Sequence, residues 1–123
     1  MQLRLLVASA MLGLCVAACS SSANATADHA ADAVTKTVYA NDFRGTTAQL
    51  DASTRGEVTR ASVGALSDLM HRMGAYKGVA LMAQDPAKND YTYTATFEHG
   101  TLIVAIRMDA KGGVAAYHVF APH

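Results

Sequence analysis

The chain has 123 residues, with ten lysine and arginine residues against ten aspartate and glutamate residues, five histidines and two cysteines. Its formal net charge is zero and it contains no basic stripe, which argues against a nucleic-acid-binding protein. The length fits one domain, and a hydrophobic content of 51% is enough to give that domain a core of its own.

The first eighteen residues combine a charged start with an apolar stretch. Arg4 carries the only charge, and the residues from Leu5 to Val16 are apolar apart from Ser9. This stretch is shorter than the about 20 residues that span a bilayer, and it is typical of a secretory signal peptide. We therefore predict a signal peptide over residues 1–18.

The motif Val16-Ala17-Ala18-Cys19 ends this segment. It resembles the lipobox of bacterial lipoproteins, in which an aliphatic and two small residues precede a cysteine that is acylated, for example with palmitate, and becomes the new N-terminus. The resemblance implies lipidation at Cys19. Because Ser20 follows where retained lipoproteins have Asp, it also implies an outer-membrane lipoprotein that faces the periplasm. The alternative is an ordinary secretory signal and a soluble secreted or periplasmic protein.

Cleavage before Cys19 would leave a chain with one cysteine and a short polar start. Cys15 would be removed with the signal peptide, so no disulfide could form within the mature chain. The residues from Ser20 to Ala27 are small and show no periodicity, which is typical of a flexible tether. We therefore predict a tether over residues 19–27 and one α+β domain over residues 28–123, held at the membrane by lipid alone.

The first half of this domain predicts helices. Apolar residues recur at a spacing of four from Asp28 to about Asn41, and a weaker short helix is expected from Thr46 to Ser53. Thr59 is a candidate N-cap for a helix from Arg60 to Met73, and Gly74 follows at the position of a C-terminal cap. The expected buried face of that helix contains Val63, Leu66, Met70 and Met73.

The second half predicts strands joined by turns. An apolar run covers Lys77–Gln84, and the next strand, Tyr91–Glu98, alternates between aromatic or small residues and threonines. Two further strands are expected over Thr101–Met108 and Val114–Phe120, with a hairpin turn between them. Helices followed by hairpin-connected strands indicate the α+β class, with two or three helices packed on an antiparallel sheet of about four strands.

Several short motifs accompany these elements. The helix from Arg60 to Met73 carries Leu66-Ser67-Asp68-Leu69, and the ends of the elements are marked by Asn41-Asp42-Phe43, Met73-Gly74, Phe97-Glu98-His99-Gly100 and the stretch from Met108 to Val114. With this layout, residues 28–121 resemble a family of small uncharacterised secreted domains of the nuclear-transport-factor-2-like or cystatin-like superfamily. The resemblance implies a curved, cone-like sheet wrapped by helices, which in some relatives encloses a pocket. The family often has an aromatic residue inside the second helix, where this chain has only aliphatic residues and methionine.

The aromatic stripe of the second predicted strand is the best candidate for a binding site. Its side chains could line a pocket with methionines of the preceding helix, because methionine adapts to varied ligands, and with Tyr117 or Phe120 of the last strand. The candidate pocket therefore comprises Tyr91, Tyr93, Phe97, Met70, Met73 and Phe120. The alternative is that these residues simply form the core between the sheet and the helices.

No catalytic, cofactor or metal set emerges from the motifs. The histidines lack the spacing of a short metal motif, and the sequence contains no nucleophile elbow or phosphate-binding loop. We expect a non-enzymatic domain that binds a small apolar ligand or another cell-envelope protein. One alternative is an enzyme that uses a cone-shaped pocket with His99, His118 or Asp68 for acid/base or hydrolytic chemistry.

Two further expectations concern surfaces. An inhibitor or accessory factor of an envelope hydrolase could act through the turn-rich segment Asp85–Asp90. Thr92, Thr94 and Thr96 share the other face of their strand, and this polar row fits a solvated sheet surface or a weak homodimer through the sheet.

Overall fold

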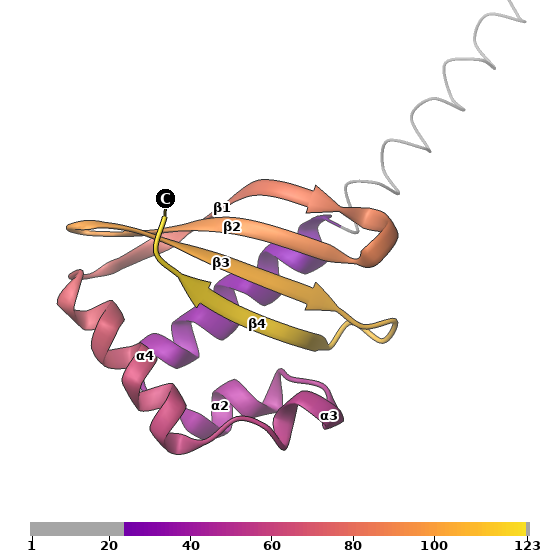
Figure 1. Ribbon diagram of the computed structural model, residues 1–123, viewed down its shortest axis with the longest axis horizontal. Coiled ribbons are helices and arrows are strands. Elements are labelled where there is room, and N and C mark those ends of the chain that lie inside the picture. The colour runs from indigo at the N-terminus through magenta and orange to yellow at the C-terminus, as the bar shows by residue number, and fades with distance from the viewer. Residues whose placement is uncertain (1–23, 123) are drawn as a thin grey trace, which may run out of the picture.

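The computed structural model describes residues 24–122, so Cys19 and the expected signal peptide lie outside the described residues (Figure 1). An N-terminal helix, described over residues 24–39, precedes three shorter α-helices and a four-stranded sheet with a 3-10 helix between its first two strands. These are α2 (Phe43–Ala48), α3 (Ala52–Arg55), α4 (Arg60–Arg72), β1 (Tyr76–Asp85), the 3-10 helix η1 (Pro86–Lys88), β2 (Asp90–Phe97), β3 (Gly100–Met108) and β4 (Val114–Phe120). The four antiparallel strands follow one another in the order β1-β2-β3-β4, which confirms the predicted α+β class.

The N-terminal helix includes residues that the sequence assigned to the tether. Residues 24–27 are helical, and Ala27 has no accessible surface because it packs in the core. The tether prediction is therefore wrong for these four residues. At the other end the helix stops at residue 39, slightly earlier than expected, and Asn41 adopts the left-handed conformation that commonly follows a helix.

The expected short helix over Thr46–Ser53 is divided into two. Asp42 caps the N-terminus of α2, where its Oδ1 accepts from the Gly45 amide at 2.9 Å, and the helix begins three residues earlier than predicted. Asp51 caps α3 in the same way, with its Oδ1 accepting from the Thr54 amide at 2.9 Å. Between the two helices Leu50 forms a parallel bridge with Val114 of β4. This bridge requires an extended residue, which explains the interruption.

The prediction for α4 is confirmed. The Ser62 amide donates to the Thr59 hydroxyl at 3.1 Å, and the Thr59 amide donates to the Ser62 hydroxyl at 3.1 Å, which together form a reciprocal N-terminal cap. Met73 caps the C-terminus, and Gly74 follows with a φ of 90°. That φ and the close approach of Glu98 favour glycine at position 74.

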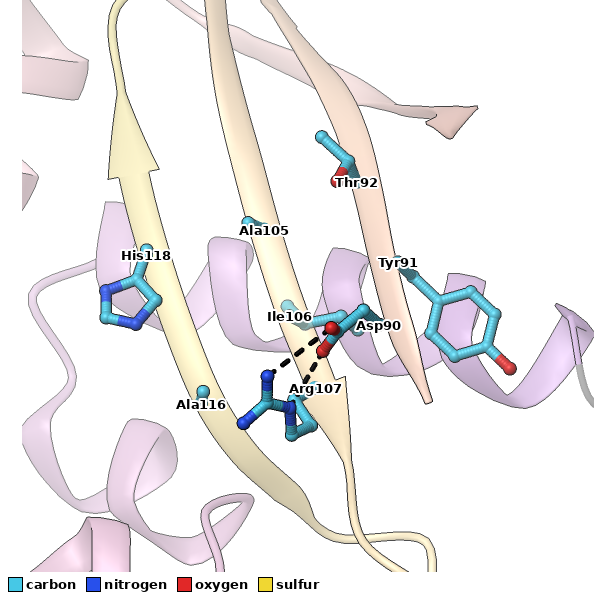
Figure 2. Close-up of a pocket in the computed structure, with 8 residues that line it drawn as sticks. All are labelled: Asp90, Tyr91, Thr92, Ala105, Ile106, Arg107, Ala116 and His118. Carbon is cyan, nitrogen blue, oxygen red and sulfur yellow. Dashed lines mark hydrogen bonds and ion pairs between the residues drawn. The ribbon is translucent and has the colours of Figure 1, made fainter. Parts of the chain in front are cut away.

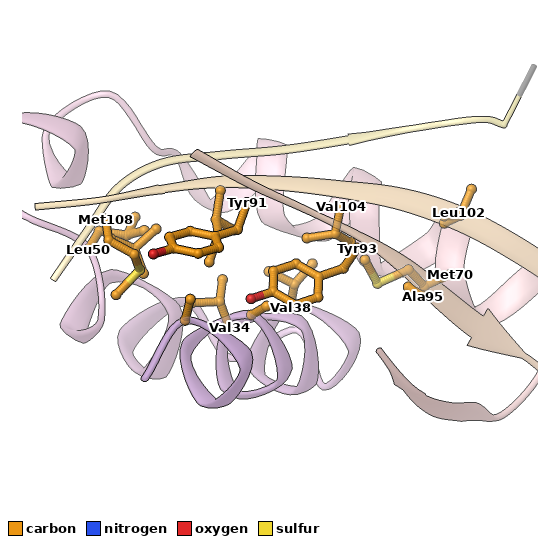
Figure 3. Packing of buried hydrophobic residues seen from close by; sticks show 14 of the residues in the cluster. Val34, Val38, Leu50, Met70, Tyr91, Tyr93, Ala95, Leu102, Val104 and Met108 are labelled. Atoms are coloured by element: carbon orange, nitrogen blue, oxygen red, sulfur yellow. The ribbon is translucent and has the colours of Figure 1, made fainter. Parts of the chain in front are cut away.

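One face of the sheet, the inner face, packs on the N-terminal helix (Figure 3). The predicted alternation is confirmed, because every second residue of β2 and β3 is buried there: Tyr91, Tyr93, Ala95, Phe97, Leu102, Val104, Ile106 and Met108. The Tyr93 hydroxyl donates to Asp28 Oδ1 at 2.9 Å, and the Tyr39 hydroxyl donates to the Gly74 carbonyl at 3.1 Å. These two bonds fix the two ends of the helix beneath the sheet.

The opposite face of the sheet, the outer face, is not covered by any described element (Figure 1). Its residues are mostly small or polar, with Ile103 and Phe120 as the large apolar members: Gly78, Ala80, Thr92, Thr94, Thr96, Ile103, Ala105, Arg107, Ala116, His118 and Phe120. The edge strand β1 breaks its register with β2 between Tyr76 and Gly78 and again between Leu81 and Ala83. Leu81 and Met82 are exposed on this edge strand.

Candidate functional site

Two concavities are candidates for a binding site. The helix pocket, with a volume of about 180 Å³, is lined by Val38, Thr46, Leu50, Thr54, Val58, Ser62, Val63, Leu66 and Tyr117. The outer-face depression, with a volume of about 290 Å³, is lined by Asp90, Tyr91, Thr92, Ala105, Ile106, Arg107, Ala116 and His118 (Figure 2).

The walls of the helix pocket come from five parts of the chain. The N-terminal helix contributes Val38, β4 contributes Tyr117, and the rest comes from α2, α4 and the segment over residues 50–58. Three hydrogen bonds tie that segment and the preceding residue, Gln49, to the start of β4. The Val114 amide donates to the Gln49 carbonyl at 3.1 Å, the Asp51 amide donates to the Val114 carbonyl at 2.9 Å, and the Thr54 hydroxyl donates to the Ala115 carbonyl. The wall is therefore held by the sheet itself.

The polar groups of the helix pocket are engaged within the protein. The Thr46 hydroxyl donates to the Asp42 carbonyl at 2.8 Å, and the Ser62 hydroxyl donates to the Thr59 carbonyl at 2.8 Å. No aspartate, glutamate, lysine, arginine or histidine is among the lining residues. A charged ligand would lose its hydration without a partner, so this pocket favours an uncharged apolar molecule.

Tyr117 is the one titratable group of the helix pocket. Its hydroxyl forms a 2.9 Å hydrogen bond with the hydroxyl of Thr35, which has no accessible surface. Burial raises the pKa of Tyr117 to about 12, although the bond with Thr35 acts in the opposite direction. The phenol therefore keeps its proton at neutral pH and is unsuited to act as a general base.

The outer-face depression is more polar. Arg107 donates from Nε to Asp90 Oδ1 at 2.8 Å and from Nη2 to Asp90 Oδ2 at 3.3 Å, as the dashed lines in Figure 2 show. The hydrogen bond from Arg107 holds the pKa of Asp90 below its ordinary value. The two charges offset each other, and the alanines Ala105 and Ala116 leave a shallow floor between this pair and His118. Such a surface suits a protein partner better than a small apolar ligand.

The six residues of the predicted pocket do not come together around either concavity. None of them lines the helix pocket, and only Tyr91 reaches the outer-face depression. Tyr93 and Met70 have no accessible surface, while Tyr91 and Phe97 are also buried and Met73 packs against the same core. The pairing of Phe120 with Ile103 places it on the outer face, where it is 43% exposed. The aromatic stripe is thus part of the core, as the alternative interpretation held.

The residues named for the enzyme alternative lie apart from one another. His99 is exposed in the turn between β2 and β3, with its Nε2 atom 3.3 Å from Glu98 Oε1. His118 projects from the outer face (Figure 2), and Asp68 is exposed on α4. Within residues 24–122 no three histidine, cysteine, aspartate or glutamate side chains are grouped closely enough to hold a metal ion. His123 lies outside the described residues.

Sequence reasoning missed most of the helix pocket. Two signals pointed toward it: the predicted apolar face of α4, with Val63 and Leu66, and the position of Tyr117 on the last strand next to the aromatic stripe. Leu50, Thr54 and Val58 come from a segment without clear periodicity, and the bonds of this segment with β4 bring it into the pocket wall.

Comparison with known proteins found no family model, no curated protein and no solved structure that matches this chain. In the part of the chain that the structure describes, no helix is long and apolar enough to cross a membrane.

Proposed function

We propose that this chain is a lipoprotein of the bacterial cell envelope, anchored through Cys19, whose α+β domain binds a small uncharged apolar molecule in the helix pocket. The observation that carries the proposal is the partly enclosed pocket between the helices and β4, with mostly apolar walls and no charged lining residue. The lipobox-like motif Val16-Ala17-Ala18-Cys19 supports the location.

The size of the pocket limits the ligand. A cavity of about 150 Å³ lined by aliphatic and aromatic side chains can bind benzene, and the helix pocket has about 180 Å³. A single ring, or an aliphatic group of similar size, would fill it. A ligand of about eight non-hydrogen atoms that gains about 0.6 kcal/mol per atom binds with about 5 kcal/mol, which corresponds to a Kd of roughly 0.3 mM.

The ligand proposal is tested by titrating the protein with toluene and with indole while recording NMR spectra of the backbone amides. We expect saturable shifts confined to residues around the helix pocket. Val58→Phe places a larger side chain in the pocket wall and should weaken binding at least tenfold. The control is Leu81→Phe, which adds a ring on exposed β1, three strand spacings from β4 and therefore about 14 Å away. Shifts that do not saturate, or equal binding by both variants, would refute the ligand proposal.

The anchor is tested separately, in cells. Cys19→Ser, or treatment with the signal-peptidase inhibitor globomycin, should cause the precursor to accumulate or the protein to leave the membrane fraction. The matched control is Ser20→Ala, which keeps the cysteine. Unchanged mass and fractionation of the Cys19→Ser protein would contradict lipidation, and would leave the ligand proposal to stand on the titration.

The outer face carries a second candidate function, the binding of another cell-envelope protein or of a second copy. The observation in its favour is the uncovered outer face, which includes the exposed Phe120. The ion pair between Asp90 and Arg107 leaves this face with little net charge of its own. Its test is whether Ala105→Arg, in the middle of that face, removes binding of a partner recovered from envelope extracts.

A further inference from the structure

The domain has two distinct ends, and the N-terminal helix runs from one to the other. At one end residues 24–29 lie beside the β3–β4 turn, because Thr26 and His29 line a depression together with Lys111, Gly112 and Gly113. Figure 1 shows η1, in the β1–β2 connection, at the same end. We call this the hairpin end: residues 24–29, η1 and the turn over residues 109–113. At the other end Tyr39 contacts Gly74, beside the turn at Glu98 and His99.

The position of residue 24 has a consequence if Cys19 is lipidated. Only five residues separate position 19 from position 24. At no more than about 3.6 Å per residue they span at most about 18 Å. The sheet itself is longer, since the eight residues of β2 cover about 26 Å. If the far end of the domain lay against the membrane, residue 24 would be farther from Cys19 than the five connecting residues can span.

We propose that the hairpin end faces the lipid bilayer and that the turn at Glu98 and His99 points away from it. This inference rests on the lipid anchor of the proposed function and does not depend on the ligand. The partner surface is the phospholipid headgroup layer, and the orientation is imposed by the short covalent connection to Cys19.

The hairpin end carries both acidic and basic side chains. Of the acids that belong to it or lie next to it, three are engaged within the protein: Asp28 accepts from Tyr93, Asp90 from Arg107, and Asp109 from the amides of Lys111 and Gly113. Another, Asp85, is exposed beside η1. Among the described residues, the ammonium groups of Lys88 and Lys111 form no ion pair, and Lys111 lines the depression beside His29. Both lysines are exposed and can reach headgroup phosphates.

The test uses single introduced cysteines, since Cys19 is the only cysteine of the expected mature chain and is acylated. Ala87→Cys and Ala110→Cys label the hairpin end, while His99→Cys and Ala121→Cys label the far end; all four positions are exposed. Each purified lipidated variant carries a fluorophore and is inserted into phosphatidylethanolamine–phosphatidylglycerol vesicles that contain nitroxide-headgroup lipid. We expect quenching at positions 87 and 110 to be at least threefold stronger than at positions 99 and 121.

A variant with a longer connection is the control. Inserting twenty Gly and Ser residues after Ser22 raises the root-mean-square reach to about 25–30 Å, comparable to the length of the sheet. The difference between the two ends should then largely disappear. Equal quenching at both ends without the insertion, or stronger quenching at position 99, would overturn the orientation while leaving the anchor intact. Failure of the unlabelled protein to float with the vesicles would overturn the anchor, and the orientation with it.

Discussion

The hydrogen bond between Thr35 and Tyr117 offers a sharp test of how the core next to the helix pocket is stabilised. Thr35 has no accessible surface, and its hydroxyl lies 2.9 Å from the Tyr117 hydroxyl. Tyr117→Phe removes one partner and leaves the buried threonine hydroxyl without it. A buried polar group that loses its partner costs about 1–3 kcal/mol, so we expect the free energy of unfolding to fall by about 1–2 kcal/mol.

The complementary variant is Thr35→Val, which removes the other hydroxyl and keeps the shape of the side chain. We expect a similar loss for this single change. The double variant leaves no unpaired hydroxyl, so it should be more stable than the sum of the two losses predicts, by about 1 kcal/mol. The four proteins are compared by urea unfolding followed by far-ultraviolet circular dichroism, which gives the free energy of unfolding by linear extrapolation. Additive losses would refute the reasoning, because they would show that the two hydroxyls do not stabilise each other.

Three other outcomes are expected. Met70→Ala, at a position without accessible surface, should lower the free energy of unfolding by about 2–5 kcal/mol, whereas Met82→Ala, at a position 55% exposed, should change it by less than about 0.5 kcal/mol; similar urea midpoints would contradict the burial pattern. Burial tends to raise the pKa of Asp32, but hydrogen bonds from Lys36 and Tyr76 outweigh it and lower that pKa. The free energy of unfolding should therefore decline as pH falls below about 4. In Asp32→Asn this part of the decline should be missing from thermal unfolding measured between about pH 2 and 7. If the outer face pairs two copies, sedimentation should show weak self-association that Ala105→Arg abolishes, and a strictly monomeric native protein at millimolar concentration would exclude the homodimer.

Much of the fold follows from local signals. The boundaries of α4 were predictable because Thr59 and Gly74 act on their immediate neighbours, and β2 was predictable because its alternation has the period of a strand. The inner face of β2 could therefore be assigned correctly from the sequence. The same pattern did not distinguish a core from a pocket lining, because both use large apolar side chains.

The remaining features depend on contacts between distant residues. Leu50 lies outside a helix because it bridges Val114, which is far along the chain. Residues 24–27 have a composition that fits both a tether and a helix, and the burial of Ala27 against the core decides between them. The helix pocket combines single residues from five segments, so no continuous pattern marks it.

The two breaks in the register of β1 would have a consequence if the proposed lipid anchor holds the protein at a membrane surface. Confinement to two dimensions brings copies of an anchored domain close together, side by side. A regular, uncovered edge strand would then offer its backbone to the edge of a neighbour, which is a route to aggregation. The irregularities next to Gly78 and Ala83 twist the edge strand and interrupt its row of donors and acceptors. This edge can therefore remain uncovered in a crowded layer without joining the sheets of adjacent molecules.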